Sequence, residues 1–167
     1  MEKFQELREN SKKKISIADH ILTQTYPLVK DSKLLLATLE NIFLALTYAM
    51  GSILYYERLF KRIPPFQDTF ESKFNMFQAK IIDKHRIDWR HVDMIREIKE
   101  IILQHKQSPI EFIRKDQLII CNNEYKMKTV SEEKIKIYMH NAKEFVNLIV
   151  KITSKDEQIF HKSIEAY

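Results

Sequence analysis

A long apolar segment, residues 31–63, constrains the fold of this chain more than any other feature of its sequence. Asp31 or Ser32 can cap a helix that starts here, by accepting a hydrogen bond from one of its first backbone amides. Pro64 and Pro65 then end the helix. Its aliphatic and aromatic residues occupy every face of the predicted helix rather than one stripe. Such a helix is either the central helix of a hydrophobic core or a membrane span.

Two polar residues in this segment decide between those alternatives. A membrane span needs about 20 residues nearly free of charge, but Glu40 and Asn41 leave only the run 42–56 uninterrupted. A carboxylate within lipid is also costly. We therefore predict a central core helix and no membrane span. Buried Glu40, Asn41 and Glu57 would then each need a hydrogen-bonding partner, because an unpaired buried polar group is unfavourable.

The chain has a single glycine among its 167 residues. Phosphate-binding loops and the tight turns of sheet-rich folds need glycine, so this composition favours long helices and disfavours nucleotide-binding folds of the Rossmann and P-loop types. Cys121 is the only cysteine, which excludes an intrachain disulfide and suits a reducing compartment. The charged N-terminal residues lack the pattern of a secretory signal. These features predict a cytoplasmic protein.

Apolar residues at helical spacing predict four further helices around the central one. The first covers residues 2–25 and is expected to end at Pro27, because the residue before a proline is disfavoured in the helical conformation. Asp68 and Glu71 stand in the relation of a capping box at the start of the third helix. The third, fourth and fifth helices are predicted over residues 66–83, from Asp88 to before Ser108, and from Ser131 to near Ser154.

The segment 110–130 has a different pattern. It combines β-branched and aromatic residues with two polar turn candidates, 115–116 and 122–123, and favours a small hairpin or a three-stranded meander. No internal repeat or linker interrupts the chain. We therefore predict one domain over residues 1–167. Its fold is mainly all-α, a five-helix bundle around the long central apolar helix, with a small β-hairpin (about 110–130) inserted between helices 4 and 5.

The sequence contains no convincing set of metal ligands or nucleophiles. A di-metal site in a helical bundle uses Glu-x-x-His pairs, and none of the six histidines belongs to such a pair. Cys121 falls within a predicted strand, where a packed thiol is expected rather than a reactive one. We predict no metal, no cofactor and no assigned catalytic residue, and an enzyme is the less favoured class.

The segment 84–91 carries more functional groups than any other stretch of similar length. Its Arg86 and His91 form an Arg-x4-His pattern, which is similar to the Arg-x4–6-His signature of HEPN-type proteins, helical bundles that include metal-independent RNases. The resemblance covers six residues and implies that His91 and Arg86 act at a scissile phosphate, usually across a dimer interface. Such chemistry suits an imidazole and a guanidinium. Ile87 departs from the polar residue that commonly follows the arginine in that family.

The formal net charge of +5 permits a nucleic-acid partner. A hairpin that follows a pair of helices is also the order seen in winged helix-turn-helix domains, and basic residues of a wing would contact phosphates. The nucleic-acid-binding candidates are Lys84, Arg86 and Arg90 around the start of the fourth helix, and Arg114, Lys115, Lys126 and Lys128 in the hairpin.

These signals rank the functions. The first expectation is a non-enzymatic helical interaction or regulatory protein, because aromatic residues are abundant and catalytic groups are scarce. Its partner would be another protein or a second copy of the chain in a homodimer, with nucleic acid as the second candidate. The alternatives are a HEPN-like RNase or toxin that uses Arg86 and His91, and a winged-helix-like DNA-binding protein.

Overall fold

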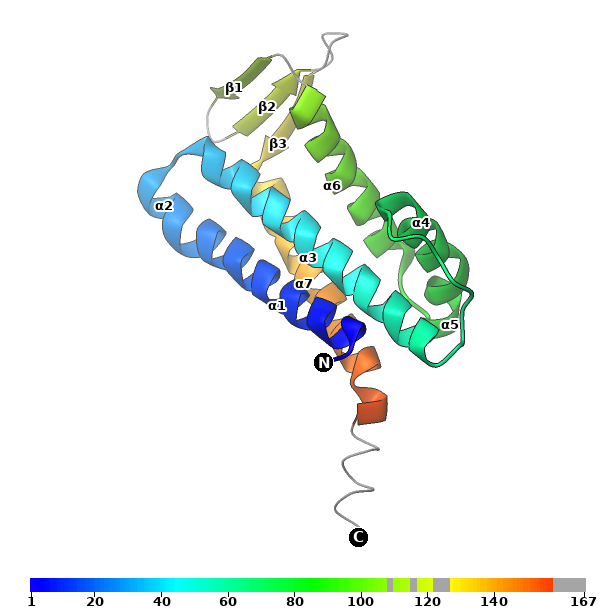
Figure 1. The fold of residues 1–167 in the computed structure, drawn as a ribbon. Helices are drawn as coiled ribbons and strands as arrows, with labels where there is room; N and C mark the ends of the chain where they lie inside the picture. The colour runs from blue at the N-terminus through cyan, green and yellow to red at the C-terminus, as the bar shows by residue number, and fades with distance from the viewer. Residues whose placement is uncertain (108–109, 115–116, 122–126, 158–167) are drawn as a thin grey trace.

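The computed structural model describes residues 1–107, 110–114, 117–121 and 127–157. Its described helices join into five continuous helical segments, which confirms the predicted mainly all-α bundle (Figure 1). The helical elements are α1 (Lys3–His20), η1 (Ile21–Thr25), α2 (Tyr26–Val29), α3 (Ser32–Leu59), α4 (Phe70–Met76), η2 (Phe77–Ile81), α5 (Ile82–His85), α6 (Trp89–Gln107) and α7 (Glu132–Thr153).

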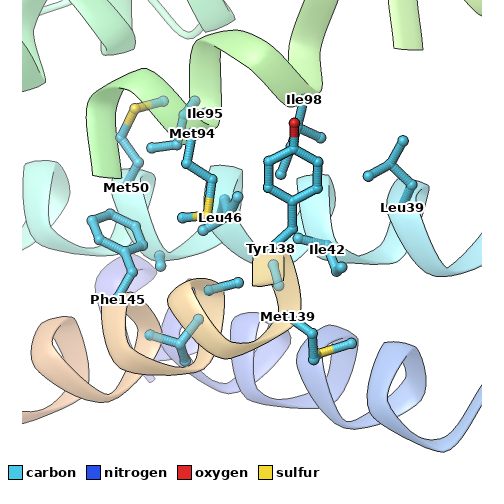
Figure 2. Packing of buried hydrophobic residues seen from close by; sticks show 14 of the residues in the cluster. Leu39, Ile42, Leu46, Met50, Met94, Ile95, Ile98, Tyr138, Met139 and Phe145 are labelled. Carbon is cyan, nitrogen blue, oxygen red and sulfur yellow. The ribbon is translucent and has the colours of Figure 1, made fainter. Parts of the chain in front are cut away.

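Helix α3 forms the centre of the bundle, as predicted. It contacts α1, α4, α6 and α7. Figure 2 shows how its side chains meet those of α6 and α7: Leu46 and Met50 lie opposite Met94 and Ile95, and Phe145 approaches from α7. By length and composition α3 could also cross a membrane, and half of its most apolar window is buried inside the bundle.

The two ends of α3 explain its observed length. Asp31 caps the first turn by accepting a hydrogen bond from Lys33 N at 2.9 Å. At the other end Lys61 adopts the left-handed conformation, with φ 56°, and Arg62 N donates to Glu57 O at 2.9 Å. This left-handed termination closes the helix at Leu59. The helix is therefore shorter than the predicted range that ended at residue 63.

Small residues allow α1 and α3 to pack closely. A Cβ atom added at Gly51 would lie only 3.2 Å from Leu7 Cδ1. Ser11 Oγ donates to Ala45 O at 2.8 Å, and Ser52 Oγ donates to Phe4 O at the same distance. The buried hydroxyls are thus satisfied by backbone carbonyls of the opposite helix.

The first helical segment continues through Pro27, so the prediction that it ends there is wrong. Proline lacks an N–H group and its ring clashes with the carbonyl four residues earlier in a regular α-helix. The five-residue π-helical segment η1 precedes Pro27, and Tyr26 N donates to Ile21 O within it. This widened turn accommodates the proline, and the helix ends at Val29, before the left-handed Lys30.

The third segment starts later than predicted and has a different cap. Thr69 Oγ1 accepts a hydrogen bond from Ser72 N at 3.2 Å, so Thr69, and not Asp68, caps α4. Asp68 instead pairs with Lys73. The segment continues through η2 and α5 to His85 and packs against α3.

A three-stranded antiparallel sheet lies between α6 and α7 in the chain, with the order β1-β2-β3. The strands are β1 (Ile110–Arg114), β2 (Gln117–Cys121) and β3 (Met127–Ser131). Buried Leu118, Ile120 and Val130 join the sheet to the helical core. Ser131 then caps α7 by accepting a hydrogen bond from Lys134 N at 3.1 Å. Of the two arrangements predicted for this segment, a hairpin or a three-stranded meander, the structure has the meander.

Two of the three polar residues predicted to be buried on α3 are not. Glu40 is exposed, and Asn41 is half-buried with its side chain donating to Ala37 O at 2.8 Å on its own helix. The reason is that the other helices do not surround α3 completely: Leu44, one turn after Glu40, is also exposed. Only Glu57 is buried as predicted.

Candidate functional site

Glu57 forms the centre of the densest cluster of ionisable side chains in the described residues. The residue is completely buried near the end of α3. Its Oε2 lies 2.7 Å from Arg62 Nε and 2.7 Å from Lys84 Nζ, and its Oε1 lies 2.6 Å from His85 Nε2. These contacts tie the end of α3 to the end of α5.

The electrostatics of this cluster keep Glu57 ionised. Burial alone would raise the pKa of the carboxyl, but hydrogen bonds from His85 and Lys84 and the charge of Arg62 outweigh it and lower the pKa to about 2. Both carboxylate oxygens are occupied by protein donors. Because the Glu57 side chain is also completely buried, the cluster is a closed structural junction and not an open site.

A second layer of polar contacts extends this junction to the residues after α7. The Tyr56 hydroxyl donates to Asp156, and Arg62 lies over the Tyr56 ring, 5.1 Å from its centroid. Burial and the Asp156 hydrogen bond raise the pKa of Tyr56 to about 12, so the phenol stays protonated. Arg8 binds both carboxylate oxygens of Glu157 at 3.0 Å. These pairs could not be predicted from the sequence, because their members lie about 100 to 150 residues apart and no local pattern links them.

The turn between α5 and α6 places three of the predicted residues in different situations. Arg86 ends the third helical segment in the left-handed conformation, with φ 53°, and its side chain is exposed. Lys84 is held by Glu57, and Arg90 NH2 lies 2.5 Å from Glu144 Oε2. Asp88 caps α6 by accepting a hydrogen bond from Arg90 N at 3.0 Å.

His91 lies inside the bundle, 4% exposed, with its ring centroid 5.4 Å from that of Phe145. Its Nδ1 has no hydrogen-bond partner within the described part of the chain. Burial, with a smaller contribution from the charge of Arg90, lowers the pKa of the imidazole and favours its neutral form. A shielded His91 beside an outward Arg86 gives the HEPN-like catalytic interpretation little support, since both groups would have to reach one phosphate.

The two groups of basic residues proposed for nucleic-acid binding lie at opposite ends of α6 (Figure 1). Lys84, Arg86 and Arg90 surround its start, whereas β1 and β3, which contain Arg114 and Lys128, follow its end. The 19 residues of α6 span about 28 Å. Lys115 and Lys126 lie outside the described residues. This separation gives no support to a winged-helix arrangement in which helix and wing contact one stretch of DNA.

An open groove of about 420 Å³ lies between the first helical segment and α7. Its apolar part includes the buried side chains of Leu22 and Met139. Charged side chains border it, and an ion pair between Asp19 and Lys143, at 2.7 Å, joins its two helices. The lining residues are Asp19, Leu22, Thr23, Pro27, Glu132, Lys136, Met139, His140 and Lys143.

Two strongly exposed apolar side chains follow the groove residue Pro27 directly. Leu28 is 87% exposed and Val29 is 60% exposed. Ile137, next to Lys136 on α7, is exposed as well. Exposed apolar side chains next to the lining residues of a groove are typical of interaction sites. This groove could not be predicted from the sequence, because residues more than 100 positions apart form its two sides.

The described residues contain no group of three or more His, Cys, Asp or Glu side chains that could hold a metal ion. Comparison of the chain with protein-family models, with curated proteins and with solved structures found no match. Any function assigned to it therefore rests on the geometry of its own residues.

Proposed function

We propose that this chain is a non-enzymatic interaction protein that binds a protein partner in the groove between the first helical segment and α7. The observation that carries the proposal is the exposure of Leu28 and Val29, which directly follow the groove-lining Pro27. Exposing two adjacent apolar side chains is unfavourable in water, and covering them with a partner would remove that cost. The single cysteine supports a cytoplasmic location.

The chemistry of the groove favours a partner with apolar and charged groups side by side. Leu22 and Met139 offer an apolar floor, and methionine adapts to differently shaped side chains. Glu132 and Lys136 place a negative and a positive charge at the border of the groove, with Glu132 Oε1 3.4 Å from Lys136 Nζ. An amphipathic helix of another protein or of a second copy of this chain fits these requirements.

Two observations favour a binding role over catalysis. The cluster around Glu57 is closed by its own donors. His91, the imidazole of the alternative RNase site, is shielded from solvent. General acid–base catalysis needs a titratable group within hydrogen-bonding reach of the substrate.

A photoreactive amino acid in place of Lys136, which lines the groove, tests the proposal in cells. We expect a discrete crosslinked product that disappears when Leu28→Asp and Val29→Asp are introduced together. Lys151 is the matched control position, because it is exposed on the same helix about 22 Å away. No product at position 136, the same product at position 151, or a product unaffected by the two aspartates contradicts the proposal.

Sedimentation velocity of the purified protein identifies the kind of partner. A dimer that the two aspartates convert to a monomer identifies a second copy of the chain as the occupant. A monomer at all concentrations, together with a crosslinked product in cells, identifies a different protein.

A further inference from the structure

Trp89, the only tryptophan in the sequence, is exposed at the start of α6. About half of its surface, 49%, is accessible. Tryptophan is highly buried on average, so an indole in this position needs an explanation. Among the described residues its indole has no hydrogen-bond partner.

A second group that the fold does not use lies three residues earlier. Arg86 is exposed, and its guanidinium has no ion-pair or hydrogen-bond partner among the described residues. Lys80, on the same helical segment as Lys84, is likewise exposed and without a partner. Lys84 and Arg90 differ, because Glu57 and Glu144 hold them. The turn thus offers a half-exposed indole and the Arg86 guanidinium to a ligand, and Lys80 adds a third exposed group on the preceding helical segment.

The backbone of this turn is held in place. Ile87 N donates to Ile82 O at 3.0 Å, and Arg86 N donates to Asp83 O at 3.4 Å. The Ile87 side chain is buried in the core cluster, and Asp88 caps α6. Arg86 and Trp89 therefore flank a buried anchor in the chain, and their Cα atoms are no more than about 11 Å apart. A platform fixed before binding loses little entropy when a ligand arrives.

We propose that Trp89 and Arg86 form a binding site for single-stranded nucleic acid. One base stacks on the indole ring, and the Arg86 guanidinium contacts a neighbouring phosphate, with Lys80 adding charge. Stacking on an aromatic side chain combined with cationic contacts to the backbone is how proteins bind single strands without sequence preference. Duplex bases are already stacked on one another, so the site selects single strands. The site is independent of the protein-binding groove.

The single tryptophan makes the test direct, because its fluorescence reports from the proposed site alone. The probe is a ten-nucleotide oligothymidylate, titrated into the full-length protein at low salt. We expect saturable quenching that weakens as salt rises. Neutralising one or two phosphates corresponds to a slope of about −0.7 to −1.4 in a plot of log affinity against log salt.

Variants assign the binding to these side chains. Anisotropy of a labelled oligothymidylate should show that Trp89→Ala weakens binding about tenfold or more, whereas Trp89→Phe retains part of the affinity. Arg86→Gln should weaken binding and reduce the salt slope by about 0.7. Lys33→Gln is the charge-matched control. Lys33 is exposed at the start of α3, whereas the proposed site follows Lys84 and His85, which contact Glu57 near the end of α3. Thermal unfolding of each variant verifies that it is folded.

Three outcomes overturn the proposal. The first is the absence of quenching at low salt. The second is unchanged binding by folded Trp89→Ala and Arg86→Gln. The third is equal quenching by polyglutamate, which would identify the turn as a general site for acidic chains and not for nucleic acid.

Discussion

Two adjacent pairs of residues, Lys84-His85 and Arg86-Trp89, have opposite roles in the molecule. Lys84 and His85 turn inward and hold the buried carboxylate of Glu57. The Arg86 and Trp89 side chains are exposed, and neither has a hydrogen-bond or ion-pair partner among the described residues. The change of direction occurs at the left-handed Arg86. A run of basic residues is therefore not one functional unit, because a buried acid elsewhere in the chain determines which cations are structural.

The largest loss of stability should come from removing Glu57, the acceptor that Lys84 and His85 share. Glu57→Ala leaves three donors without their acceptor. It also creates a cavity at a buried position. We expect the free energy of unfolding to fall by about 3 kcal/mol, at the lower end for a broken buried ion pair, since Arg62 and Lys84 can turn to solvent. Urea unfolding measures it. Glu40→Ala is the control, an exposed glutamate on the same helix, with an expected change below about 0.5 kcal/mol. Equal losses in both variants would disprove the structural role of the cluster.

Acid should remove part of the same stabilisation. The pKa of Glu57 is lowered from 4.5 to about 2. A carboxyl with a lowered pKa stabilises the fold above its unfolded value, and this contribution is lost as pH falls towards the folded value. Urea unfolding of the parent and of Glu57→Gln at pH 5, 4 and 3 should show the difference between them shrinking with each step. A difference that stays constant from pH 5 to pH 3 contradicts the assignment.

Removing one of the three donors should have a smaller effect. Lys84→Met leaves Arg62 and His85 in contact with Glu57, and the Lys84 side chain is partly exposed, so solvent screens its charge. We expect a loss of about 1 kcal/mol. Lys80→Met removes a lysine from the same helical segment that has no partner among the described residues, and it should change stability by less than about 0.5 kcal/mol. If Lys80→Met costs as much as Lys84→Met, the distinction between structural and available cations fails.

Local patterns predicted most of the fold, because helical spacing and caps depend on neighbouring residues. The errors have physical causes. Pro27 was expected to end a helix, but the π-helical turn before it makes room for the ring. Glu40 was expected to be buried, because an apolar helix was assumed to be surrounded on all sides. Glu57 was correctly predicted to be buried, although its partners Lys84 and His85 could not be identified from sequence spacing.

The candidate surfaces were less predictable than the helices. Arg86 and Arg90 were both basic candidates. Arg90 has a local acidic neighbour in Asp88, but its ion pair with Glu144 forms only after α6 and α7 pack together. The exposure of Trp89 has the same origin, because it depends on which face of α6 the bundle covers. The groove beside Leu28 requires the first segment and α7 to lie side by side. Tertiary packing, and not sequence distance, decides these features.

The smallest effect on stability should come from Arg86→Gly, and this variant separates folding from binding most sharply. A left-handed φ of 53° disfavours any residue with a Cβ, so glycine relieves strain. The gain offsets the larger chain entropy of glycine when unfolded and the loss of a positive charge near a helix end. We expect the free energy of unfolding to stay within about 0.5 kcal/mol of the parent while the affinity for oligothymidylate falls. Lys61→Gly is the matched control, because Lys61 ends α3 in the same conformation, with φ 56°, and should change neither stability nor affinity appreciably. If both glycine variants bind as the parent does, the left-handed Arg86 serves only to end a helix.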